Sequence, residues 1–185
     1  RCLSRLIGKL GDVTNSVIDF GCGDGLYAEQ TGLMDAKYVG IDISESMIAL
    51  ATERFSEHRN FHGIVGGVDK LSTLAGDVDL ILAIDVVAYL SDSEESNFYS
   101  ESSRLLRKGG NLIVLTGNEL FDLFALNSGT VDFFQRNFDQ DILPLLSEGG
   151  ASRFKNTKRK NPLVYDCSLS SFGFEKRDIA FSQFH

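Results

Sequence analysis

Acidic and glycine residues alternate in one short stretch of this 185-residue chain. An apolar segment that contains Asp19 leads into Gly21, Gly23 and Gly25, with Cys22 between the first two glycines. Alternating glycines let a backbone turn tightly and let a ligand approach bare peptide groups. A carboxylate at this place disfavours a pyrophosphate ligand, because like charges repel in a partly dry site. The pattern therefore favours a ligand that carries cationic groups.

A second apolar segment ends in another acid, Asp42, which lies 21 residues after Gly21. Parallel strands of an α/β sheet bind ligands at their carboxyl ends, so this carboxylate would lie beside the glycine loop. Its two oxygens can accept hydrogen bonds from the two hydroxyls of a ribose. Taken alone, Asp42 also fits a helix N-cap or a solvated strand-end acid. Its spacing from the loop favours the ribose-binding role.

The acid–glycine run resembles motif I of the class I S-adenosylmethionine-dependent methyltransferases, (Asp/Glu)-x-Gly-x-Gly-x-Gly. Their cofactor carries a sulfonium and an ammonium group and no phosphate. The resemblance covers about residues 13–117, and more loosely the rest, and implies that the loop binds this cofactor, with Cys22 acting through its backbone. The nicotinamide or flavin fingerprint, Gly-x-Gly-x-x-Gly/Ala, fits less well, because Leu26 stands where the third small residue should follow Gly21.

The resemblance implies further cofactor contacts after the later strands. Apolar side chains that follow Asp42 would pack against adenine, and residues after the third and fourth strands would face the cofactor. These residues are Ile43, Met47, Gly67, Val68, Ala83 and Ile84. Met47 equally fits a core position on its own helix. The acid that the family usually carries after its third strand is missing here or displaced to Asp69.

Two residues after the fourth apolar segment, Asp85 and Tyr89, are the candidates for catalysis. The resemblance implies that Asp85 stands at the mouth of the substrate site. Either residue could act as a general base, which is needed only when the acceptor arrives protonated, as a hydroxyl does. The alternatives are an acid that caps a turn for Asp85 and a packed aromatic side chain for Tyr89.

Strand and helix patterns alternate around these residues, which predicts a doubly wound, mostly parallel sheet with helices on both faces. Ser91 and Glu94 are spaced as a capping box, and Gly109–Gly110 would stop the helix that they open. We expect helices over 3–10, 26–33, 44–58 and from 91 onward, and strands that include 17–20, 38–42, 64–65, 80–84 and 112–115. The resemblance implies a seven-stranded sheet, with terminal elements absent or cut off here.

The alternating pattern predicts a single methyltransferase domain over residues 1–185, with a helical insertion on the substrate side at about 118–161. Phenylalanines within the insertion would dock it onto the sheet, and a minority would line the acceptor pocket. The basic run at 153–160 is either a solvated loop or a clamp for an anionic acceptor such as a sugar nucleotide. The expected acceptor is therefore a small molecule, of anionic or sugar type.

Composition argues against several other classes of function. The formal net charge of −8 disfavours nucleic acid as a partner. The three cysteines form no Cys-x-x-Cys pair and no metal-ligand spacing, so we expect no metal and free thiols in a reducing cytoplasm. The apolar runs are too short to span a bilayer, so we expect no membrane partner.

The sequence thus predicts S-adenosylmethionine-dependent methyl transfer to a small-molecule acceptor in the cytoplasm. Two alternatives remain beside this prediction. The first is a non-catalytic module that binds S-adenosylmethionine, and the second is an NAD(P)-linked oxidoreductase.

Overall fold

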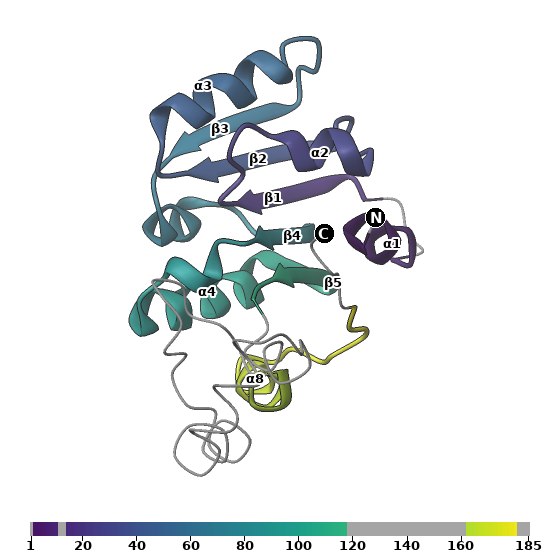
Figure 1. Cartoon of the computed structure of the whole chain (residues 1–185), viewed down its shortest axis with the longest axis vertical. Helices are drawn as coiled ribbons and strands as arrows, with labels where there is room; N and C mark the ends of the chain where they lie inside the picture. Colours follow the sequence, from purple (N-terminus) through teal and green to yellow (C-terminus); the bar gives the residue numbers. More distant parts are fainter. Residues whose placement is uncertain (1, 11–13, 118–161, 181–185) are drawn as a thin grey trace, which may run out of the picture.

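The computed structural model describes residues 2–10, 14–117 and 162–180. In these residues five parallel strands form one sheet: β1 (Ser16–Phe20), β2 (Lys37–Asp42), β3 (Phe61–Val65), β4 (Val78–Ile84) and β5 (Leu106–Leu115). Their order is β3-β2-β1-β4-β5 (Figure 1). The chain thus adds strands outward from β1 in one direction and then returns to add β4 and β5 on the other side. This is the predicted doubly wound arrangement.

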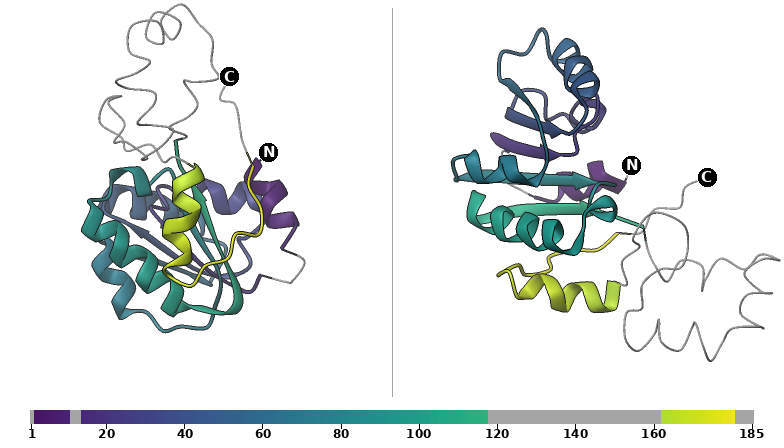
Figure 2. Two further views of the ribbon diagram at one scale, coloured as in Figure 1. Left: turned by 90° about the horizontal axis from the view of Figure 1, so that it is seen from below. Right: turned by 90° about the vertical axis from the view of Figure 1, so that its left-hand side faces the viewer.

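Helices cover both faces of the sheet (Figure 2). The helices are α1 (Cys2–Gly8), α2 (Leu26–Thr31), α3 (Glu45–Arg54), α4 (Asp92–Leu105) and α8 (Pro162–Ser170), with 3₁₀ helices η1 (Val68–Thr73) and η2 (Val87–Tyr89). One apolar cluster joins the sheet to α1, α2 and the end of α3, and a second joins it to η1, α4 and α8. The expected insertion at 118–161, with its phenylalanines and basic run, lies outside the described residues.

The packing of strand β4 on both faces explains why its sequence is apolar without interruption. Leu80, Leu82 and Ile84 enter the cluster under α1 and α2, whereas Ile81 and Ala83 enter the cluster under α4. A strand with both faces covered needs apolar side chains at every position, because successive side chains point to opposite faces. The buried central strand expected over residues 80–84 is therefore confirmed.

The capping box at the start of α4 is also confirmed. The Ser91 hydroxyl accepts from the Glu94 peptide N–H at 3.3 Å, and the Glu94 carboxylate accepts from the Ser91 N–H at 2.8 Å. The inner face of α4 includes Tyr99, which the sequence pattern did not single out. Its ring lies 5.6 Å from that of Phe172, so Tyr99 helps to join α4 to the segment after α8.

Two expected helix ends are wrong. The helix expected to reach residue 58 ends at Arg54, where Phe55 leaves the helix and buries its ring. The glycine pair Gly109–Gly110 does not stop α4, because Leu106 already adopts an extended conformation and pairs with Val78. The two glycines instead lie in β5, where the register with β4 shifts and Gly109 has a φ of 80°.

Asp79 joins the amino ends of three strands, at the edge opposite the glycine loop. Its carboxylate accepts from the peptide N–H groups of Asn15 and Ser16, at 2.9 and 3.0 Å, and pairs with Arg107 Nε at 2.5 Å. Burial alone would raise the pKa of Asp79, but hydrogen bonds from Arg107, Asn15 and Ser16 outweigh it and lower the pKa from 3.8 to about 2. The ionised carboxylate therefore stabilises the folded state.

We expect the Asp79→Asn variant to lose about 2 kcal/mol of unfolding free energy at pH 7. A depressed folded-state pKa contributes stability above the unfolded value of 3.8, and that contribution disappears as the pH falls toward 2. Urea denaturation at pH 7 and at pH 3 measures the difference between wild type and variant. A difference that stays constant between the two pH values would contradict the ionised role of Asp79.

Candidate ligand-binding site

The acid–glycine run forms a loop between β1 and α2, at the carboxyl edge of the sheet. Gly21, Gly23 and Gly25 have φ values of 76°, 54° and 77°, in the left-handed region that glycine adopts readily. The peptide N–H groups of Gly21 and Cys22 both donate to the carbonyl of Ile41, at 2.8 and 3.1 Å. The loop is therefore folded back onto the end of β2.

The three glycines face different surroundings. A Cβ at Gly21 would lie 2.7 Å from the Val86 side chain, and one at Gly25 would lie 3.0 Å from the Phe55 ring. These two glycines let the loop pack against its neighbours. A Cβ at Gly23 would meet no atom of the described residues within 4 Å. Gly23 thus presents its backbone to open space, where a ligand can approach.

Asp42 fastens this loop to the start of α3. One carboxylate oxygen accepts from the Gly23 peptide N–H and the other from the Ser44 N–H, both at 2.9 Å. Ser44 is the N-cap of α3, so Asp42 sits beside the cap and does not occupy it. Each carboxylate oxygen has a second lone pair, so these two bonds leave capacity for the hydroxyls of a ribose.

Asp19 is buried near the carboxyl end of β1, the central strand of the sheet, directly below the loop. One of its oxygens accepts from the Tyr38 hydroxyl at 2.6 Å, and the other has no hydrogen-bond partner within the described part of the chain. Burial, reinforced by the charge of Asp42 and opposed by the Tyr38 bond, raises the pKa of Asp19 from 3.8 to about 6. Asp19 is therefore a carboxylate with unused hydrogen-bonding capacity, which suits a cationic partner.

The Cys22 side chain turns away from the open side of the loop. It is buried and lies against the backbone of β2, where a Cβ on Gly40 would be 2.9 Å from its sulfur. Burial and the nearby charges of Asp19 and Asp42 raise the pKa of the thiol. A thiol that resists ionisation is a poor nucleophile, which agrees with a backbone role for this residue.

Large apolar side chains are exposed around the same edge. Ile43 follows β2 and is 81% exposed, and Met47 in the first turn of α3 is 39% exposed, so the alternative of a core position for Met47 is wrong. Others at this edge are Leu26, Val65 and Tyr89. Apolar residues that gather on one side of a glycine loop favour a ligand with a flat apolar part, such as a nucleobase.

The remaining expected contacts lie at the ends of β3 and β4. The N–H of Gly67 donates to the Asp69 carboxylate at 3.2 Å, so Asp69 closes its own turn. Val68 and Ala83 have buried side chains, as does Ile84, and these residues can offer only backbone groups to a ligand. The structure thus brings all of the expected cofactor residues to one edge of the sheet.

The two catalytic candidates follow β4. Asp85 has a φ of 54°, rare for a residue with a side chain, and its N–H donates to the Leu115 carbonyl at 3.0 Å. Desolvation raises the pKa of Asp85, although its side chain is exposed. Tyr89 lies in η2 and is 71% exposed, so the alternative of a packed aromatic side chain is wrong.

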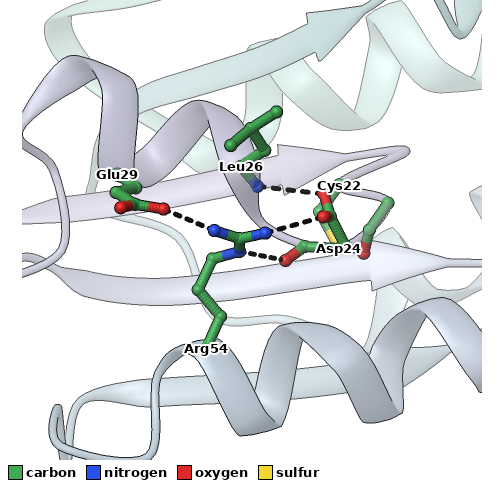
Figure 3. A network of polar contacts seen from close by, with 6 residues as sticks. Cys22, Asp24, Leu26, Glu29 and Arg54 are labelled. Atoms are coloured by element: carbon green, nitrogen blue, oxygen red, sulfur yellow. Dashed lines mark hydrogen bonds and ion pairs between the residues drawn. The ribbon is translucent and has the colours of Figure 1, made fainter.

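Sequence reasoning missed Arg54, whose guanidinium reaches the loop from the last turn of α3 (Figure 3). Its Nε donates to the Asp24 carbonyl at 2.9 Å, and Nη2 pairs with the Asp24 carboxylate at 2.7 Å. Nη1 pairs with Glu29 on α2. No local signal in the sequence links an arginine to a loop 30 residues earlier.

Comparisons with known proteins agree with this geometry. A family model described as a methyltransferase domain matches residues 17–110, just over half of the chain. A ubiquinone biosynthesis O-methyltransferase from Rhizobium etli is 31% identical over 115 residues, which cover 60% of this chain and 44% of that protein. A similar enzyme from Azorhizobium caulinodans is 28% identical over 164 residues, covering 81% of this chain and 62% of that protein. The chain thus spans less than two thirds of these relatives.

A solved structure is also similar in fold to this chain. Magnesium protoporphyrin IX methyltransferase from Synechocystis, crystallised with bound SAH, superimposes with a TM-score of 0.64, 19% identity, and coverage of 98% of this chain and 73% of its own. This chain belongs to the class I methyltransferase family, whose cofactor is S-adenosylmethionine. The predicted family, fold class and cofactor are therefore confirmed.

Within the described ranges, no group of His, Cys, Asp and Glu side chains could hold a metal ion. The same residues contain no helix with the length and apolar character that crossing a bilayer requires.

Proposed function

We propose that this protein binds S-adenosylmethionine at the carboxyl edge of β1 and β2 and transfers its methyl group to a small-molecule acceptor. The observation that carries the proposal is Gly23, a left-handed residue with open space beside it and an amide held by Asp42. The site lies next to the point where strand order reverses between β1 and β4. Ligands of doubly wound sheets bind at such points.

The residues at this edge fit the chemistry of that cofactor. Asp19 and Asp42 supply negative charge, and Asp19 has an oxygen without a partner in the described residues, so the site favours a sulfonium and an ammonium group. Ile43 and Met47 offer apolar surface for the adenine. When bound, the cofactor supplies an electrophilic methyl group. The protein residues then contribute mainly by positioning the two reactants, which is worth about 7–11 kcal/mol in favourable cases.

We further propose a hydroxyl-bearing acceptor, because the two curated relatives described above are O-methyltransferases. A hydroxyl must lose its proton when it is methylated, and we assign that proton to Asp85, which is exposed directly after β4. Desolvation raises the pKa of Asp85, which makes its carboxylate a stronger base than a fully hydrated one. The basic run at 153–160 supports an anionic acceptor, such as a sugar nucleotide, by charge complementarity alone.

Two experiments test this function. Calorimetric titration with S-adenosylhomocysteine and, separately, with NADH should show binding of the first compound only. Incubation with methyl-labelled S-adenosylmethionine and a metabolite extract should then transfer label to a small molecule. Binding of NADH alone would favour an oxidoreductase. Cofactor binding without label transfer would favour the non-catalytic module.

We expect the Asp42→Ala variant to bind S-adenosylhomocysteine more weakly by about 1–3 kcal/mol, the scale of losing hydrogen bonds to a charged group. The variant loses the proposed bonds to the ribose and also the anchor of the Gly23 amide. Calorimetric titration measures the change. The Glu45→Ala variant is the matched control, because it removes one exposed negative charge from the first turn of α3. Equal affinities for the two variants would argue against a role for Asp42.

A further inference from the structure

The contacts of Arg54 are unlike those of an ordinary surface arginine. Two of its nitrogens bind a single residue, Asp24, through both the main-chain carbonyl and the carboxylate. The third nitrogen pairs with Glu29, and Figure 3 shows the guanidinium lying between these partners. The Arg54 side chain is only 28% exposed. Three directed bonds from one planar group fix the position of Asp24 more firmly than a single ion pair would.

Asp24 lies between Gly23 and Gly25, at the most open part of the loop. The Gly23 N–H is held by Asp42, just before α3, and the Asp24 carbonyl is held by Arg54, in the last turn of α3. These two bonds flank the peptide that joins Gly23 to Asp24. Residues at the two ends of α3 therefore hold the loop on either side of this peptide. The Gly23–Asp24 peptide has little freedom to rotate as a result.

Such freedom would matter, because the three left-handed glycines, at alternate positions of the loop, have little conformational preference of their own. A loop that must be ordered when its ligand binds loses affinity by the cost of that ordering. The Asp24 carboxylate also accepts from the N–H of Leu26, the first residue of α2, at 3.2 Å. Arg54 thus fixes both the loop and its exit into the helix.

We propose that Arg54 is a positioning residue that holds the glycine loop in its ligand-binding shape before the cofactor arrives. This inference rests on the proposed function for its effect on affinity, but its effect on the loop is independent of any ligand. The pairing with Asp24 and Glu29 also neutralises the guanidinium, so that it does not repel a cationic cofactor nearby.

Hydrogen exchange of the unliganded protein and titration with S-adenosylhomocysteine test the proposal together. In Arg54→Met, the amides of residues 21–26 should exchange about tenfold faster, and the dissociation constant should rise about tenfold, the scale of losing charge-assisted hydrogen bonds. Arg54→Lys should restore part of the wild-type exchange rate and affinity. A lysine can reach one acceptor but cannot reproduce the several directed bonds of the planar guanidinium.

Arg107→Met is the matched control. Arg107 is 32% exposed, pairs with Asp79 and lies at the opposite edge of the sheet, so its loss should affect global stability without changing loop exchange or affinity. Equal loop exchange in Arg54→Met and Arg107→Met would overturn the proposal, as would equal affinities. If the wild type binds no S-adenosylhomocysteine, the proposed function fails, and the exchange comparison alone still decides whether Arg54 holds the loop.

Discussion

Replacing Gly23 with valine should abolish the binding of S-adenosylhomocysteine, with a loss of at least about 100-fold, or nearly 3 kcal/mol. The new side chain would occupy the open space beside the loop, where no atom of the described residues lies within 4 Å. It would therefore clash with a ligand and not with the protein. Calorimetric titration measures the affinity, and circular dichroism checks that the variant is folded.

Gly32→Val is the control for this result. Gly32 has a φ of 72°, and a Cβ there would also meet no described atom within 4 Å, but it lies at the other end of α2, as its C-cap. Both variants carry a similar backbone cost, about 1–2 kcal/mol for a side chain in the left-handed region. Only the Gly23 variant should lose affinity. Retained binding by Gly23→Val would show that the loop does not approach the ligand, and the matched alanine variants repeat the comparison with less strain.

The Asp19→Asn variant should remove a pH dependence of both stability and binding. The folded-state pKa of Asp19 is about 6, above its ordinary value of 3.8, because the carboxyl group is buried. The folded protein therefore holds this proton between pH 4 and 6, where the unfolded chain has released it. Wild-type stability should fall, relative to the variant, by about 2 kcal/mol as the pH rises from 4 to 7.

Binding should change in the opposite direction. Ionised Asp19 attracts a cationic ligand, so the affinity of the wild type for S-adenosylmethionine should rise about tenfold between pH 5 and 7. The Asn variant keeps an acceptor for the Tyr38 hydroxyl but cannot ionise, so its affinity should lack this increase. Urea denaturation and calorimetric titration across the pH range, with the two proteins side by side, measure both differences. Parallel curves for the two proteins would exclude Asp19 as the titrating group.

If both results hold, the site combines two opposed requirements. Asp19 makes the unliganded protein less stable at neutral pH, because a buried carboxylate loses its hydration. The same group favours the cationic cofactor once it binds. The acid in the middle of the sheet would then lower the stability of the empty protein and raise its affinity for the cofactor.

The elements that carry strong local signals were predictable from the sequence. The capping box at Ser91 and Glu94 depends on contacts within one turn of helix, and the apolar run of β4 depends only on burial of both faces. The run from Asp19 to Gly25 indicated the family before any coordinates, because left-handed turns restrict the residue type strongly. In these segments the residue types alone therefore indicate the local conformation.

Only the tertiary structure showed what each residue of the loop does. Gly21 and Gly25 are small because Val86 and Phe55 pack against them, whereas Gly23 faces open space. Arg54 entered the site through contacts with a residue 30 positions earlier, and no periodicity reports such a pair. The sequence thus determined the family, the parallel fold and the acids at the strand ends, because these depend on neighbouring residues. The structure decided how the loop is held, because that depends on side chains that meet only when β1, β2 and α3 pack together.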